Sequence, residues 1–488
     1  MRRRGVLVFA AGAAALLGTG CAQAVPAAAT ALASANPVAA SAAAAGASGV
    51  WGRAITVPGL GALNTGRNAD VLSVSCPSPG SCAAGGYYQN HGRHGFVAVE
   101  RNGRWRQAVE VPGLKALGKG GSQVSAVSCA SPGFCAAGGY YGNHSRNPYD
   151  VTTGRGFVAV ERSGRWHRAV QVPGLVALNR GGNAEVSSVW CASRGYCAAV
   201  GFYTDGGGHQ QGFVAVERSG VWGAAAGVPG LGALNTGGNA VVSSVSCAAP
   251  GNCAAGGRYS NASGERAFVV SEANGSWGTA RQVAANLRTG LDAFVESVSC
   301  GSAGNCAAGG EFSLASGEAQ AFVVSEVNGT WAAARAVAGT RSCCGGAVVT
   351  SVSCASAGNC AAGGQWDYGG YNAAFLVNEK NGVWGPGIRV PGLNRVARDA
   401  YLSSVSCASA GNCAAGGEYD GGGNGVFVVR ENNGVWGKQT TVPGLGALNK
   451  GTSLGVSSVS CPSAGSCVAG GYYQEAGSRY ALQGFVTQ

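Results

Sequence analysis

Short apolar runs alternate with turn-forming residues along most of the chain, and the same order of runs returns about every 54 residues. In one copy, Ser403–Cys407 leads into a turn and then into Cys413–Gly417. A glycine-rich loop, the apolar run Val426–Val429 and a turn before Trp436 complete the unit. Each unit therefore predicts four short strands separated by turns. The apolar residues show no 3.6-residue period, so the pattern does not indicate helical repeats.

The third run of each unit is apolar nearly throughout, as in Phe96–Val99, which is typical of a strand buried on both faces between neighbouring sheets. The repeat tryptophan occurs eight times, but Trp51 precedes the first unit and no tryptophan follows the last. Residues 49–57 are therefore predicted to supply the outer strand of the last unit, which removes the free sheet edge. The sequence predicts an all-β fold, an eight-bladed β-propeller of four-stranded blades with N-/C-terminal ring closure.

Sixteen of the 19 cysteines form eight Cys-x5-Cys pairs, one in each unit. In an exported chain such pairs predict disulfides, whereas zinc sites, the alternative, favour closer spacing. The predicted bridges are Cys76–Cys82, Cys129–Cys135, Cys191–Cys197, Cys247–Cys253, Cys300–Cys306, Cys354–Cys360, Cys407–Cys413 and Cys461–Cys467. Of the remaining cysteines, Cys343 and Cys344 predict a vicinal disulfide, with free thiols or intermolecular pairing as the alternative.

Residues 1–24 are predicted to be a signal peptide. Arg2–Arg4 precede an apolar stretch that is too short for a permanent membrane anchor, and Ala22–Ala24 provide a cleavage site. Leu17–Cys21 supports a second interpretation, a lipoprotein signal in which Cys21 is acylated. The predicted location is extracellular, either secreted or lipid-anchored at the cell surface.

An alanine-rich segment with two prolines, residues 25–48, is predicted to be a flexible linker. The propeller is predicted to span residues 49–488, and the protein is expected to be a monomer.

The repeat resembles those of the Asp-box (BNR) propellers and of the photosystem II assembly-factor-like propellers. Val74–Cys76, Ala83–Gly86 and Asn102–Trp105 stand where those repeats have Val-x-Phe, Ala-Val-Gly and Asp-Gly-Gly-x-Trp. The Cys pairs depart from that pattern, and an asparagine or serine replaces the box aspartate. The resemblance implies a propeller fold over residues 49–488 and no particular function, because one fold hosts many.

Charge and chemistry narrow the function classes. The net charge is +11, but no Lys/Arg run occurs beyond Arg2–Arg4, so nucleic-acid binding has no clustered footprint. The five histidines lack metal-ligand spacing, and no cofactor motif is present, so neither a metal nor a cofactor is expected. An active site would be sought where the repeat is broken, at Trp366, Asp367, Asp399 and Asp420.

The best binding candidate is an aromatic position that follows the Ala-Ala-Gly-Gly segment in every unit. Such rings stack on sugars or contact peptides, and they also pack between blades. Both interpretations stay open for Tyr88, Tyr141, Tyr203, Tyr259, Phe312, Trp366, Tyr419 and Tyr473.

Two further repeated features are predicted to be structural. The leucine of the Val-Pro-Gly-Leu turn is expected to fill the gap between blades. The glutamate that ends the third run is expected to anchor a turn or to face solvent, with a cation-binding ring as the alternative.

These features favour an exported, non-catalytic binding or scaffold protein whose partner is a glycan or a cell-surface protein. Near-equivalent blades suit repeated weak contacts. The alternative is a secreted carbohydrate-active enzyme, a glycoside hydrolase or lyase, which requires convergent carboxylates.

Overall fold

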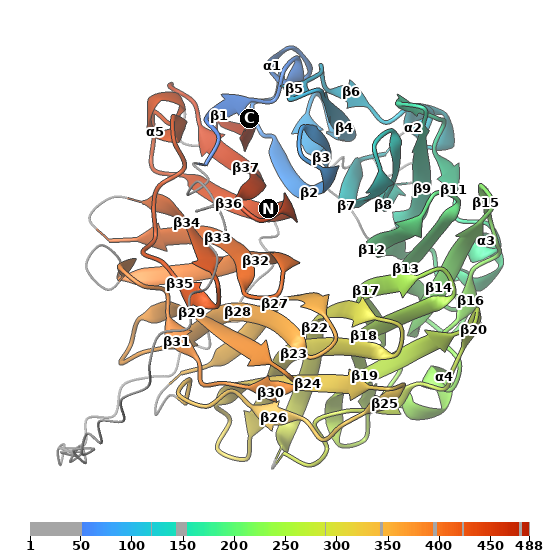
Figure 1. The fold of residues 1–488 in the computed structure, drawn as a ribbon. Helices are drawn as coiled ribbons and strands as arrows, with labels where there is room; N and C mark the ends of the chain where they lie inside the picture. The colour runs from blue at the N-terminus through green and yellow to red at the C-terminus, as the bar shows by residue number, and fades with distance from the viewer. Residues whose placement is uncertain are drawn as a thin grey trace, which may run out of the picture. The chain divides into compact units, whose positions relative to one another are not determined.

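The computed structural model describes residues 51–118, 120–142, 154–287, 289–341, 345–393, 398–421, 424–477 and 481–487. The chain divides into two units, 1–48 and 49–488. Within the second unit, eight antiparallel sheets follow one another around a central axis (Figure 1). The predicted eight-bladed β-propeller is confirmed. The predicted signal peptide, the predicted linker, Cys21, Cys343 and Cys344 lie outside the described residues.

Each blade begins with an innermost strand and a second strand that returns antiparallel to it. The innermost strands are β2 (Asp70–Ser78), β7 (Ser122–Ser131), β12 (Ala184–Ser193), β17 (Val241–Ala249), β22 (Thr289–Ser302), β27 (Ala347–Ser356), β32 (Asp399–Ser409) and β36 (Leu454–Ser463). The second strands are β3 (Ser81–Gln89), β8 (Phe134–Gly142), β13 (Tyr196–Thr204), β18 (Asn252–Asn261), β23 (Asn305–Leu314), β28 (Asn359–Asp367), β33 (Asn412–Asp420) and β37 (Ser466–Gln474).

The third strand carries the apolar run, and a short strand with the repeat tryptophan pairs with its end. The third strands are β4 (Arg93–Arg101), β9 (Gly154–Arg162), β14 (Gln210–Arg218), β19 (Gly264–Ala273), β24 (Ala319–Val327), β29 (Asn372–Lys380), β34 (Gly425–Asn432) and β38 (Leu482–Thr487). The tryptophan strands are β5 (Arg104–Trp105), β10 (Arg165–Trp166), β15 (Val221–Trp222), β20 (Ser276–Trp277), β25 (Thr330–Trp331), β30 (Val383–Trp384) and β35 (Val435–Trp436).

The predicted outer strand is broken in two in most blades, because a second short strand follows the tryptophan and pairs with the same third strand. These pieces are β6 (Val109–Glu110), β11 (Val170–Gln171), β16 (Ala226–Gly227), β21 (Arg281–Gln282), β26 (Arg335–Ala336) and β31 (Ile388–Arg389). Single-turn helices begin at the leucine of the Val-Pro-Gly-Leu turns, namely α1 (Leu60–Leu63), α2 (Leu114–Leu117), α3 (Leu175–Leu178), α4 (Leu231–Leu234) and α5 (Leu445–Leu448).

The ring closes as the count of tryptophans predicts. Strand β1 (Ala54–Thr56) pairs with β38, and Ala54 lies opposite Thr487. Trp51 is buried in the cluster that joins the last two blades. The first and last blades therefore lie side by side near the two ends of the described chain (Figure 1).

Apolar packing occurs between blades. Eight buried clusters each join two neighbouring blades, and the phenylalanine of each third strand is fully buried in one of them. The leucines of the Val-Pro-Gly-Leu turns, such as Leu60 and Leu175, are also fully buried there, as predicted. The last glycine of Ala-Ala-Gly-Gly has no room for a side chain, since a Cβ on Gly417 would overlap the carbonyl oxygen of Tyr401.

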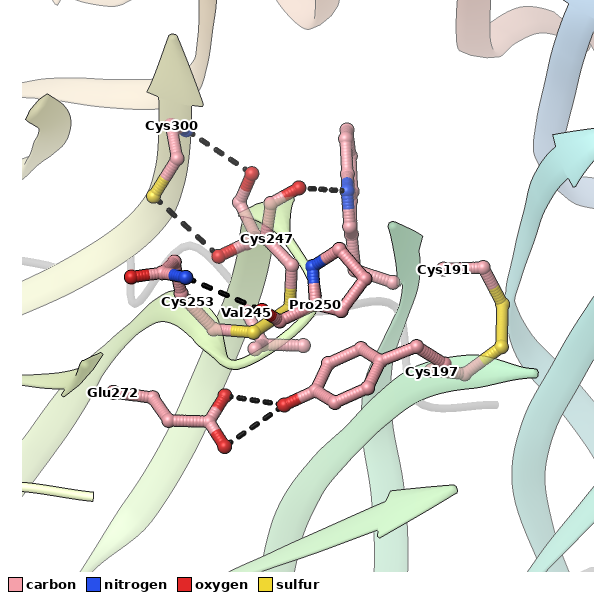
Figure 2. Close-up of a disulfide and its surroundings, with 12 residues drawn as sticks. Cys191, Cys197, Val245, Cys247, Pro250, Cys253, Glu272 and Cys300 are labelled. Atoms are coloured by element: carbon pink, nitrogen blue, oxygen red, sulfur yellow. Dashed lines mark hydrogen bonds between the residues drawn. A yellow bond between two sulfur atoms is a disulfide. The ribbon is translucent and has the colours of Figure 1, made fainter. Parts of the chain in front are cut away.

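All eight predicted disulfides are present. Each joins the innermost strand to the second strand of one blade, next to the turn between them; Figure 2 shows Cys191–Cys197 and Cys247–Cys253 in neighbouring blades. This turn lies beside the turn of the third strand, because Gly103 N–H donates to the Gly80 carbonyl (3.0 Å). We call this end of the ring the disulfide face, and the opposite end the loop face.

Serine side chains connect the innermost strands of neighbouring blades around the channel. In the first belt, the serine before the first cysteine accepts a hydrogen bond from that cysteine's counterpart in the next blade, as in Ser75 with Cys129 N–H (2.9 Å). In the second belt, the serine two positions earlier does the same for a valine, as in Ser404 with Val459 N–H (3.0 Å). Seven such bonds form each belt.

Each belt departs from the pattern once. Trp190 replaces a serine in the first belt, and its indole N–H donates to the Cys247 carbonyl (2.9 Å), which Figure 2 shows as a dashed line. Ala126 replaces a serine in the second belt and leaves Val189 N–H without that partner. The two serines of the repeated Ser-Val-Ser-Cys motif thus accept hydrogen bonds that connect neighbouring blades.

The glutamates that end the third strands are buried between blades, so of the two expected roles, anchoring a turn or facing solvent, the second is wrong. Glu161 is 2% exposed and pairs with Arg101 of the preceding blade (3.2 Å). Glu272 accepts the hydroxyl of Tyr196 (2.6 Å) in the same way (Figure 2). Burial raises the pKa of Glu161 and Glu272. Among the described residues no cluster of metal ligands is found.

Candidate functional site: a tyrosine and arginine pocket

The predicted aromatic positions all lie on second strands, and their rings pack between blades. Seven of the eight side chains are between 1% and 9% exposed, and Tyr419 is half-buried. Even the hydroxyls have protein partners in two blades, since Tyr88 bonds to Glu110 (3.1 Å) and Tyr473 to Thr56 (2.6 Å). A ligand would therefore reach little of these rings, and ligand contact by them stays a prediction.

The exposed aromatic side chains are other residues than the predicted ones. Among the described residues they are Tyr368 (56% exposed), Tyr371 (45%) and Trp190 (39%). The two tyrosines belong to the loop that joins β28 to β29 in blade six, on the loop face. They line an open pocket of about 440 Å³ together with Gly369, Ala373, Arg389 and Arg398. Small-molecule sites typically occupy about 300–1,000 Å³.

A tight turn holds the two tyrosines on the same loop. Tyr368 N–H donates to the Tyr371 carbonyl (2.7 Å), and Gly370 N–H donates to the Asp367 carboxylate (2.8 Å). Gly369 and Gly370 have φ angles of 69° and 91°, a region that strongly favours glycine. The sequence Asp-Tyr-Gly-Gly-Tyr therefore dictates this geometry locally.

Each exposed tyrosine carries an arginine over its ring. Arg389, from the end of β31, lies 4.7 Å from the ring centre of Tyr368. Arg398, which precedes β32 of blade seven, lies 5.3 Å from that of Tyr371 and donates to its hydroxyl (3.3 Å). The contact with Tyr371 raises the pKa of the Arg398 guanidinium. The pocket thus combines two aromatic faces with two permanent cations.

Buried residues beneath the pocket fix its walls. Trp366, one of the predicted ligand-binding aromatics, is 4% exposed and meets Tyr368 edge-on at 6.0 Å. Asn372, which follows the loop, donates to Asp399 from its backbone (2.8 Å) and to the Tyr401 hydroxyl from its side chain (3.0 Å). Trp366 therefore supports the pocket from below.

The three aspartates singled out from the sequence lie around this pocket. Asp399 and Asp420 are directly opposite each other on β32 and β33, and the Asp420 carbonyl accepts Arg398 N–H (2.6 Å). Asp367 caps the tyrosine turn. None of the three lines the pocket. The sequence thus indicated the two blades that carry this pocket, but not the two tyrosines and two arginines that line it; the one available signal was the unique Tyr-Gly-Gly-Tyr loop.

Two acidic side chains near the loop-face end of the channel have raised pKa values. Burial raises the pKa of Asp70 in blade one to about 7, with Glu418 adding to the shift and the Ser457 hydroxyl opposing it. Burial raises the pKa of Glu311 in blade five to about 7, and Glu296 and Asp292 add to it. No described cavity brings these two carboxyls together.

A smaller cavity of about 270 Å³ lies on the disulfide face between blades one and two. Ser81 lines it, at the register position that Phe134 and Tyr196 hold in the next two blades. The large rings in those blades are buried at 5% and 6% exposure.

Comparison with known proteins finds matches among solved structures only. No family model matches the chain, and no curated protein shows significant sequence similarity. The solved structures that match include Sqt1 of Chaetomium thermophilum, with 13% identity over 87% of this chain and 96% of that one, at a TM-score of 0.48.

A Hadza microbial sialidase matches with 11% identity over 80% of this chain and 72% of that one, at a TM-score of 0.36. The β-propeller domain of the Trilobed protease from Pyrococcus furiosus matches with 7% identity over 77% and 98%, at 0.42. The Asp-box and photosystem II assembly-factor-like character stays a resemblance.

Proposed function

We propose that this propeller is an exported, non-catalytic binding protein that recognises a glycan on its loop face. The observation that carries the proposal is the exposure of Tyr368 and Tyr371 around a pocket of about 440 Å³. Exposed tyrosine faces stack on the apolar faces of sugar rings, and neighbouring donors bind sugar hydroxyls. A cell-surface protein is the other partner class to test.

Export is part of the proposal. Eight disulfides indicate an oxidising environment. Among the described residues, no helix is long and apolar enough to cross a membrane. Mass spectrometry of the mature N-terminus distinguishes cleavage after Ala24 from acylation at Cys21. Recovery of the intact, unprocessed chain in the cytoplasm would contradict export.

The binding test uses the full chain, kept oxidised, on a panel of immobilised polysaccharides and peptidoglycan. We expect retention by at least one glycan, and we expect Tyr368→Ala combined with Tyr371→Ala to abolish it. Val221→Ala, which trims a 71% exposed side chain in blade three, is the matched control and should bind normally. Equal retention of the double variant would contradict the pocket, and no retention by any glycan would contradict the proposal.

A second candidate, a secreted glycoside hydrolase or lyase, draws on one observation. Asp399 and Asp420 lie opposite each other beside the pocket, where paired carboxylates could serve as acid and base. Two hydrogen bonds from Asn372 already engage the Asp399 carboxylate, which favours a structural role. Release of soluble sugar from the retained glycan, lost in Asp420→Asn, would establish the enzyme in place of the binding protein.

A further inference from the structure

The charge of the pocket is unbalanced. Its lining residues include two arginines and no carboxylate. The side chain of Arg389 is half-buried, but its guanidinium has no hydrogen-bond or ion-pair partner among the described residues. No described ion pair reaches Arg398 either, although the Asp399 and Asp420 carboxylates lie close enough to attract its guanidinium.

The stacking contacts leave the donor edges of both arginines open. A guanidinium that lies over an aromatic ring uses its flat face, and its N–H groups point outward in the plane. Arg389 therefore keeps all of its side-chain donors, and Arg398 gives one to the Tyr371 hydroxyl. The rings also hold both arginine side chains in place, which lowers the entropy cost of binding.

Resting on the proposed glycan recognition, we infer that the pocket selects an anionic sugar unit, whose ring stacks on Tyr368 or Tyr371 and whose oxyanion binds Arg389 and Arg398. Carboxylate and sulfate groups both accept paired N–H donors from a guanidinium. A uronic acid and a sulfated sugar are the two sources of that chemistry. A neutral sugar would leave both arginine edges without an acceptor.

The experiment compares three soluble polymers, namely polygalacturonate, dextran sulfate and neutral dextran, by calorimetry at about 150 mM salt, where long-range attraction is screened. The screening matters because the chain carries a net charge of +11 and would attract any polyanion weakly. We expect polygalacturonate or dextran sulfate to bind about tenfold or more tightly than dextran. Binding of polygalacturonate alone identifies a uronic acid, and binding of dextran sulfate alone identifies a sulfated sugar.

A pair of double variants separates specific recognition from net charge. Arg389→Ala combined with Arg398→Ala should lower affinity for the anionic polymer at least about tenfold. Arg281→Ala combined with Arg335→Ala removes the same charge from exposed positions on β21 and β26, the equivalents of β31 in other blades, and should change affinity little. Thermal melting of both variants confirms that they fold.

The outcomes distinguish the two proposals. Equal loss in both double variants would overturn the inference, because attraction would follow net charge. Dextran bound as tightly as the anionic polymers would also overturn it, while glycan recognition itself would stand. If the protein binds none of the three polymers and is retained by no glycan of the binding panel, the proposed function fails and the inference fails with it.

Discussion

The disulfide face and the loop face of the same ring are built by opposite rules. On the disulfide face, every blade repeats a bridge and its turn, and the adjoining serine belts differ at only two positions, Ala126 and Trp190. On the loop face, the connections differ between blades, and one of them carries the exposed tyrosines of the pocket. Repetition thus marks what holds the blades together, and departure from it marks the candidate site.

The largest expected effect breaks the repeated face. Reducing the oxidised protein removes all eight bridges, each of which constrains a short loop and contributes about 2–3 kcal/mol by the chain-entropy estimate. We expect the reduced chain to be unfolded already near room temperature, so that heating it shows no cooperative unfolding transition. Circular dichroism melting with and without reductant measures this. An unchanged melting temperature would show that the apolar clusters alone hold the ring.

The next effect contrasts a buried tyrosine with an exposed one. Tyr259 is 1% exposed and packs against Phe268, so Tyr259→Ala should lower the free energy of unfolding by about 3–5 kcal/mol. Tyr368→Ala, at 56% exposure, should change it by less than about 0.5 kcal/mol. Denaturant titration of both variants tests the pair. Similar losses would mean that the pocket tyrosine is a packing residue.

A single belt contact should matter less. Ser404→Ala removes the acceptor of Val459 N–H, and we expect a loss of about 1 kcal/mol in the free energy of unfolding. Ala126→Ser, which offers the missing acceptor to Val189, should gain about 0.5–1 kcal/mol. Denaturant midpoints report both. Stabilisation by Ser404→Ala would contradict a role for the belts.

The last effect concerns pH at the channel. The folded pKa of Asp70, about 7, exceeds its ordinary value of 3.8, so the folded state binds the proton more tightly. Its contribution to stability is therefore present below about pH 4 and is lost as the pH rises through 7. Asp70→Asn should lessen the fall in stability between pH 5 and pH 8, measured by denaturant midpoints. An unchanged slope would assign the pH dependence to other groups, such as Glu311.

The fold could be predicted because its sequence pattern is repeated many times. Each blade repeats the same strands, turns and cysteines, so the count of Trp51 against the last unit was enough to predict ring closure. The burial of the repeated aromatic side chains was harder to predict from the sequence. A strand inside a propeller is covered on both faces, so alternation does not tell which side chain stays exposed.

The pocket was harder to predict because its parts are scattered. Tyr368 and Arg398 belong to different blades, and Tyr368 does not recur at its position in the other units. The broken repeat at Asp367 and Asp399 indicated the region. Only the folded ring shows that the aspartates shape the turns while the tyrosines and arginines line the cavity.

Ring closure also sets an order in time. The hydroxyls of Thr56 and Tyr473 meet across a separation of 417 positions, so one strand of the closing blade is synthesised long before its partners. Contacts of such long range are slow to form, because the loop entropy is lost before the contact rewards it. Until the final strand arrives, the nascent chain presents open sheet edges to its surroundings. Protection of those edges from other chains during that interval is therefore a concern that comes with this architecture.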